Sequence, residues 1–197
     1  MTSKLSGYGA GLVITLMWAC WAIATQIGLQ NDLSIYDMLA LRLFVSCLIV
    51  VPVVFYMKQW KGLSVKQYVV LAFLGGIPHS FLAYGALERT TIAHFSVFLY
   101  GMTPVATALI GYVFFKNRIS KKQLISIVFI VLGIVALGID DLLKGISGTA
   151  WLGNAMAFSA IASWAGYMVF AERWNINVSQ SLMACTIING LIYLPVW

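Results

Sequence analysis

The chain has 197 residues, of which 61% are hydrophobic and 9% are charged, and its formal net charge is +6. Soluble domains carry roughly 25% charged residues, so this composition excludes an ordinary soluble enzyme and predicts an integral membrane protein in contact with a lipid bilayer. The excess of basic over acidic residues is expected to reflect which loops lie on the cytoplasmic side of the membrane. No nucleic-acid partner is expected.

Seven apolar stretches follow one another along the chain. A bilayer core of ~30 Å needs about 20 apolar residues in one helix, so each stretch predicts a membrane-spanning helix. They cover residues 8–29, 35–57, 68–87, 92–115, 124–139, 151–171 and 181–197.

The last two stretches resemble the first two. A shift of 143 positions places Trp21 on Trp164 and Pro52 on Pro195. An odd number of spans per repeat inserts the second copy upside down, as in many secondary transporters. We therefore predict an all-α polytopic membrane protein with a five-helix repeat over residues 1–145. The first two helices of an inverted second repeat are expected to follow over residues 146–197.

Basic residues gather in alternate loops. The positive-inside rule then places the N-terminus in the cytoplasm, and the expected location is a bacterial inner (plasma) membrane. Arg42, inside a span, is not counted. The less basic side holds Arg89 and Lys144 beside several carboxylates. The other side holds nine basic residues, namely Lys4, Lys58, Lys61, Lys66, Lys116, Arg118, Lys121, Lys122 and Arg173.

Polar side chains form stripes on the first, third and fourth spans, whereas the fifth span has none and is expected to face lipid. A polar stripe on a membrane helix faces other helices or a watery cavity. Both interpretations stay open for each stripe, and three stripes together favour a substrate cavity. Its candidate residues are Thr15, Trp18, Gln26, Arg42, His79, Tyr84, Ser96, Tyr100, Thr103, Thr107 and Trp164.

Three features near the membrane interior sharpen this prediction. The sequence Gly75-Gly76-Ile77-Pro78 predicts a kink in the third span. Arg42 is expected to snorkel, to pair with Asp37 or to face the cavity. His79 is a candidate proton relay, with a neutral packing histidine as the alternative.

The three cysteines are expected to be small buried hydrophobes. No metal, cofactor or catalytic constellation is expected.

Three segments carry a family resemblance. They are residues 84–93 (YGALERTTIA), 102–109 (MTPVATAL) and 118–123 (RISKKQ). Together they resemble the EamA-type transporters of the drug/metabolite transporter (DMT) superfamily. The resemblance implies a ten-helix fold of two inverted five-helix repeats around a central cavity. It also implies alternating access and transport of small metabolites or drugs without ATP hydrolysis, with export and a homodimer as expectations. Asn117 departs from the family, which commonly has Glu there.

The second repeat stops within its second helix at Trp197, so the chain is expected to be C-terminally incomplete. Its polar groups are then expected to lack the partners that the eighth to tenth spans would provide, namely Asn154, Ser159, Ser163 and Asn189. The alternative function is that of a non-transporting seven-helix membrane assembly or interaction protein.

Overall fold

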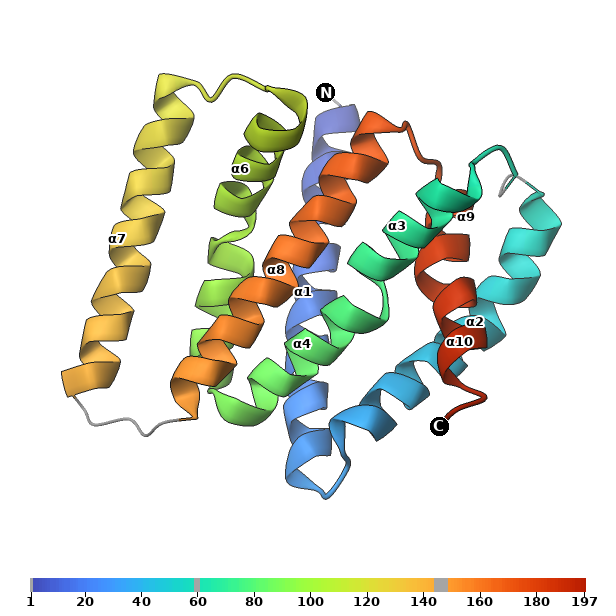
Figure 1. The fold of residues 1–197 in the computed structure, drawn as a ribbon, viewed down its shortest axis with the longest axis horizontal. Coiled ribbons are helices and arrows are strands. Elements are labelled where there is room, and N and C mark those ends of the chain that lie inside the picture. Colours follow the sequence, from blue (N-terminus) through green and yellow to red (C-terminus); the bar gives the residue numbers. More distant parts are fainter. Residues whose placement is uncertain (1, 59–60, 144–148) are drawn as a thin grey trace.

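The computed structural model describes residues 2–58, 61–143 and 149–197, and all regular structure in them is helical (Figure 1). Two segments, η1 and η2, are π-helical. The segments are α1 (Thr2–Gln30), α2 (Ile35–Met57), α3 (Val65–Gly75), α4 (Ile77–Arg89), α5 (Ile92–Ser96), η1 (Val97–Gly101), α6 (Thr103–Phe115), α7 (Lys121–Leu143), α8 (Ala150–Arg173), α9 (Val178–Leu182), η2 (Met183–Ile188) and α10 (Asn189–Tyr193).

The predicted membrane spans match these helices closely. The second and fourth coincide with the observed bounds, although the fourth comprises α5, η1 and α6. Within the described chain, four helical stretches are long and apolar enough to cross a membrane. They are Gly7–Gln30, Ile35–Met57, Val65–Arg89 and Ile92–Phe115.

Several helices begin before the apolar run because polar residues cap them. Ser64 caps α3 and exchanges hydrogen bonds with Gln67, and Asn177 caps α9 in the same way with Gln180. Such a capping box satisfies two backbone N–H groups that the first turn would leave free. The helix start is therefore set by the cap rather than by hydropathy.

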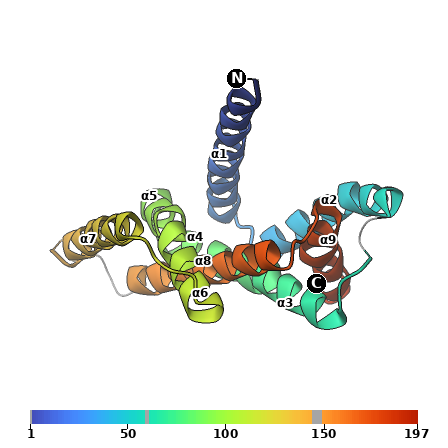
Figure 2. The same ribbon diagram turned by 90° about the horizontal axis from the view of Figure 1, so that it is seen from above.

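Helix α8 lies at the centre of the fold and packs against α3, α4 and α6 (Figures 1 and 2). Its contact with α4 is made of small side chains, with Ala83 and Ala86 facing Ala157 and Ala160, all fully buried. Small residues let membrane helices approach closely. This contact joins the third predicted span to the sixth.

Two helices lie at the edges of the group formed by α3, α4, α6 and α8. Helix α7 forms one edge, and the N-terminal half of α1 stands away from the other helices (Figure 2). Many of their apolar side chains are exposed, including Phe129 on α7 and Met17 on α1. In a bilayer this apolar surface meets lipid, which suits the expectation for the fifth span.

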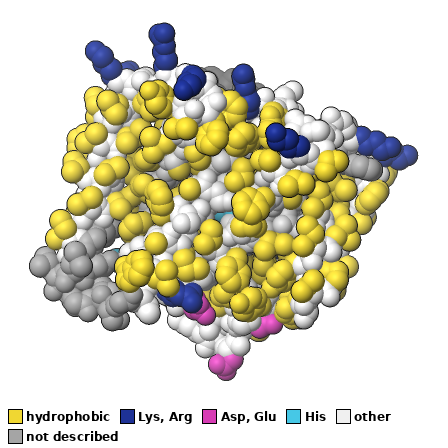
Figure 3. All heavy atoms as spheres, viewed as in Figure 1, with side chains coloured by type: hydrophobic (Ala, Val, Ile, Leu, Met, Phe, Trp, Pro, Cys, Tyr) yellow, Lys and Arg dark blue, Asp and Glu magenta, His cyan; other side chains and the backbone are white. Residues whose placement is uncertain are grey.

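The charged side chains lie at opposite ends of the molecule. Figure 3 shows Lys and Arg side chains along one end, and Asp and Glu at the other together with one basic side chain. The α6–α7 connection, which contains Arg118, belongs to the basic end (Figures 1 and 3). The apolar band between the two ends is the region that the bilayer would cover.

The third predicted span is broken, as its Gly-Gly-Ile-Pro sequence predicts. Helix α3 ends at Gly75, Gly76 has non-helical backbone angles, and α4 starts at Ile77 with Pro78 in its first turn. Proline is tolerated there because its missing N–H has no helical partner to lose. Pro104 likewise stands in the first turn of α6, directly after η1.

Candidate functional site

The break between α3 and α4 leaves backbone groups without helical partners inside an apolar layer. The Asn189 side chain bridges them. Its Nδ2 donates to Ala72 O at 3.1 Å, and its Oδ1 accepts from the Ile77 N–H at 3.0 Å. Asn189 is only 3% exposed. An unpaired backbone group in a membrane costs several kcal/mol, so this one side chain makes the break tolerable.

Ser163 on the sixth predicted span adds to this support, and Asn189 is itself anchored to the seventh. Ser163 on α8 donates to Leu74 O at 2.7 Å. Asn189 also donates to Ala184 O and Cys185 O, both in η2, at 3.0 and 3.3 Å. The carbonyls of α3 are thus held by side chains from α8 and α10.

Three of the four polar groups on the sixth and seventh predicted spans have hydrogen-bond partners within the described chain. Ser163 and Asn189 bind the broken helix, and Ser159 donates to Ala155 O at 2.8 Å on its own helix. The reason is that a helix break supplies free carbonyl and N–H groups that a regular helix does not. Asn154 fits the expectation, because its Oδ1 is buried without a hydrogen-bond partner.

Arg42 reaches the break from α2. Its guanidinium donates to the Ser80 hydroxyl, which in turn donates to Gly76 O at 3.0 Å. Asp37, the partner considered from the sequence, is occupied by Ser34 and by the Trp197 indole at 3.1 Å. Arg42 is half-buried, and it is connected through Ser80 to Gly76, the non-helical residue of the third span.

His79 lies on the other side of the break, against α8. Its Nδ1 is 2.8 Å from Ala160 O, and its ring centroid is 5.1 Å from that of Trp164. A carbonyl can only accept, so Nδ1 carries the proton and Nε2 is left as an acceptor. The centroid of the Trp164 ring is 5.0 Å from that of the Tyr167 ring, and the Tyr167 hydroxyl is hydrogen-bonded to the Ser181 hydroxyl.

A second aromatic group joins α1 to the fourth predicted span. Trp18 stacks on Tyr100 with 5.2 Å between centroids and 8° between planes. Phe95 meets Tyr100 edge-on, and Trp21 lies between Phe95 and the fully buried Tyr84. Trp18 remains 44% exposed, so this pair lies at the surface of the layer.

The remaining candidates are not brought together. The hydroxyls of Thr15, Thr103 and Thr107 each donate to a carbonyl of their own helix turn, at 2.9 Å. Ser96 is half-buried on α5, and the Gln26 Oε1 is buried without a partner. The predicted set therefore divides into the break, the Trp18–Tyr100 pair and isolated positions.

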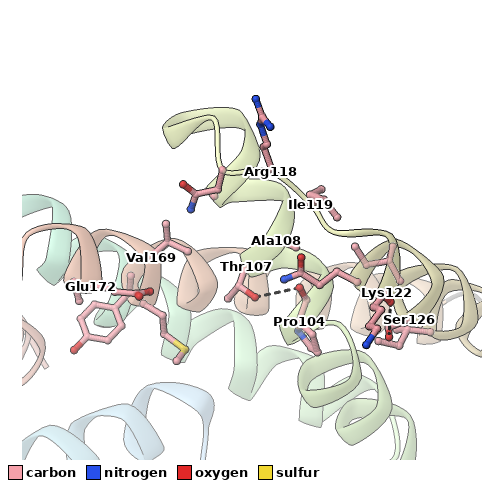
Figure 4. A pocket seen from close by; sticks show the side chains of 17 residues that line it. Pro104, Thr107, Ala108, Arg118, Ile119, Lys122, Ser126, Val169 and Glu172 are labelled. Atoms are coloured by element: carbon pink, nitrogen blue, oxygen red, sulfur yellow. Dashed lines mark hydrogen bonds between the residues drawn. The ribbon is translucent and has the colours of Figure 1, made fainter.

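Two cavities flank these groups. The larger, about 870 Å³, lies between α6, α7 and α8, and Thr107 and Tyr167 line it (Figure 4). The smaller, about 370 Å³, lies at the other end, and Gln26, Glu88 and His94 are among its lining residues. Arg42, His79 and Trp164 line neither of the two.

Sequence reasoning proposed no role in this site for Ser163 or Asn189, and it treated Cys185 as an inert core residue. A single Asn in an apolar stretch is a usable signal, because a buried amide needs four hydrogen-bond partners. The sequence could not say that those partners lie on the third span, since the contact crosses more than a hundred residues.

Comparison with known proteins gives one match. The model of the EamA-like transporter family matches residues 5–139. Neither a curated protein nor a solved structure matches the chain.

Proposed function

Because the chain belongs to the EamA-like transporter family, we propose that it is a secondary transporter that exports small metabolites or drugs by alternating access. The observation that carries the proposal is the break between α3 and α4, surrounded by polar and aromatic side chains. Discontinuous membrane helices commonly form the binding sites of secondary transporters. Two inverted repeats around a central cavity belong to this proposal as well.

The break between α3 and α4 gives a substrate polar backbone groups to bind, which an unbroken helix does not. The C-terminal end of α3 and the N-terminal end of α4 meet at Gly76, so carbonyl and N–H dipoles of opposite sign lie next to each other. His79 and Trp164 stand beside them, and Arg42 contributes a positive charge through Ser80. A polar or aromatic solute could exchange hydrogen bonds and ring contacts with this group.

The Trp18–Tyr100 stack is suited to act as a gate. It joins α1 to η1 by ring contact, and ring stacking of this kind contributes about 0.5–1.5 kcal/mol. That is small enough to open and close on the timescale of transport. Helix α1, whose N-terminal half has few neighbours, is the element that would move (Figure 2).

His79 is the candidate group for proton coupling. With Nδ1 donating to Ala160 O, only Nε2 can take up a proton, and that nitrogen belongs to a ring flanked by Trp164. Protonation there would place a second cation near Arg42, and their repulsion would favour a rearrangement of the break.

One observation favours the alternative of a non-transporting membrane assembly protein. Arg42, His79 and Trp164 contact protein groups and line neither cavity. In a transporter these contacts would have to open towards a substrate path, whereas in an assembly protein they would be permanent. Transport measurements separate the two functions.

We expect Trp18→Ala, Tyr100→Ala and Arg42→Ala to lower transport at least tenfold in membrane vesicles. Each removes a ring contact or charge at the proposed path. Phe129→Ala is the matched control, because Phe129 is 71% exposed on α7 and should leave transport unchanged. All variants are compared at equal membrane abundance. Equal effects across the four would favour plain packing and the assembly function.

The cytoplasmic N-terminus is tested by accessibility. In a cysteine-free background, Lys61→Cys and Lys121→Cys should react with an impermeant maleimide only from the cytoplasmic side. Asp141→Cys should react from the outside. The expectation rests on the nine-to-two distribution of basic residues. Labelling of Lys121→Cys from outside would reverse the topology.

A further inference from the structure

The larger cavity lies beside the helix break rather than in it. Its walls are α6, α8 and the separate edge helix α7, and its volume is about 870 Å³ (Figure 4). It begins at the α6–α7 connection, at the basic end of the molecule, and continues inward along all three helices. The proposed transport path gives this space no role.

The inner part of the cavity is apolar, and its depth is close to half the thickness of the hydrocarbon core of a bilayer. Pro104 and Ala108 line it from α6, and Ile127 and Ile130 line it from α7. From Lys122 to Ile130 the helix rises about 12 Å, at ~1.5 Å per residue. Half of a ~30 Å hydrocarbon core is about 15 Å. The groove therefore extends from headgroup depth towards the middle of the bilayer.

The mouth of the cavity is basic. Arg118 and Lys122 line it, and Lys121 adjoins them in the sequence. Glu172, on α8, lies across the cavity from Lys122 (Figure 4). Among the described residues none of these side chains forms an ion pair. Lys122 and Glu172 face each other across the cavity, and the exposed Arg118, whose side chain points outward from the α6–α7 connection in Figure 4, adds a further positive charge at the rim. The rim therefore carries an excess of positive charge at the depth where an anionic headgroup would be held.

We propose that this cavity binds an anionic phospholipid, with Arg118 and Lys122 at the phosphate and one acyl chain between α6 and α7. Basic pockets between membrane helices are suited to anionic headgroups. A soluble anion would leave the 12 Å apolar groove empty, and a zwitterionic lipid would leave the excess charge uncompensated. The lipid would also fill the gap that separates α7 from α8. The inference depends on membrane insertion and not on the proposed transport activity.

Native mass spectrometry of the detergent-purified protein tests the site, with phosphatidylglycerol and phosphatidylcholine of identical acyl chains as probes. Each basic residue beside an anionic headgroup contributes about fivefold in affinity. The double variant R118Q/K122Q should therefore bind phosphatidylglycerol roughly 20- to 30-fold more weakly, with unchanged phosphatidylcholine binding. The matched control K58Q/K66Q removes the same charge at the end of α2 and the start of α3, and it should bind as the parent does.

Two further arms identify the occupant. Ala108→Trp fills the groove without changing charge, and it should also weaken phosphatidylglycerol binding, with circular dichroism verifying the fold. Soluble glycerol phosphate should compete poorly, because it lacks the acyl chain. Equal binding of the two lipids, an equal loss in K58Q/K66Q, or full competition by glycerol phosphate would overturn the proposal. So would loss of a dimer rather than of lipid in Ala108→Trp, which would assign the groove to a second copy of the chain.

Discussion

Replacing Gly76 by alanine is expected to destabilise the protein by about 3 kcal/mol or more and to abolish transport. A Cβ at this position would lie 2.1 Å from Asn189 Nδ2 and 2.2 Å from Ala72 O. The second atom belongs to the backbone and cannot swing aside. Overpacking alone costs about 1–3 kcal/mol, and displacing Asn189 adds about 1–3 kcal/mol for each buried group left unpaired.

The measurement is unfolding in mixed detergent micelles with increasing sodium dodecyl sulfate, followed by tryptophan fluorescence. Gly133→Ala is the control, because a Cβ on Gly133 in α7 meets nothing within 4 Å. That variant should be as stable as the parent or slightly more stable, since alanine favours the helix by up to about 1 kcal/mol. A Gly76→Ala protein with parental stability would show that the break does not need the close contact.

The helices could be predicted because the bilayer imposes a length and an apolar composition on each span. The predicted and observed bounds of α2 coincide, since its Ser34–Asp37 cap lies where the apolar run begins. The predicted start of α7 was three residues late. Ser120 and Gln123 exchange hydrogen bonds before the apolar run, and this local signal determines the start of the helix.

The π-helical segments could not be predicted from hydropathy, although each has a local cause. Pro104 follows the end of η1 by three residues, and its missing N–H cannot bond to the carbonyl of Tyr100, which lies in η1. In η2 the Asn189 amide takes two carbonyls that the helix would otherwise use itself. The pattern of apolar residues is the same in an α-helix and in a helix that widens for one turn.

The candidate site was predictable only where the residue itself is unusual. Gly76 and Pro78 predict the break, and Arg42 and His79 stand out as ionisable residues in apolar spans. The pairing of these residues did not follow, because Ser80 and Ala160 are ordinary residues, and the packing of α2, α4 and α8 is what brings them and Trp164 close. The spacing of residues predicts which of them share one face of a helix, but it does not predict which other helix packs against that face.

Replacing Asn189 by leucine is expected to cost about 2–6 kcal/mol in the same unfolding measurement. Leucine has the same branched side-chain skeleton but is bulkier and cannot form hydrogen bonds, so it leaves the Ile77 N–H and the Ala72 carbonyl unpaired in an apolar layer. Each such group costs about 1–3 kcal/mol. Transport at matched abundance should fall with stability, because the two halves of the third span would no longer be held at their junction.

Asn154→Leu is the matched control for this change, since the Asn154 Oδ1 is already buried without a partner. Replacing an unsatisfied amide by an apolar side chain should be neutral or stabilising. A double variant sharpens the test. Gly76→Ala already displaces Asn189, so adding Asn189→Leu should cost less than the sum of the two single changes. If the two costs are additive, or if Asn189→Leu is as stable as Asn154→Leu, Asn189 does not support the break, and another group must hold α3 and α4 together.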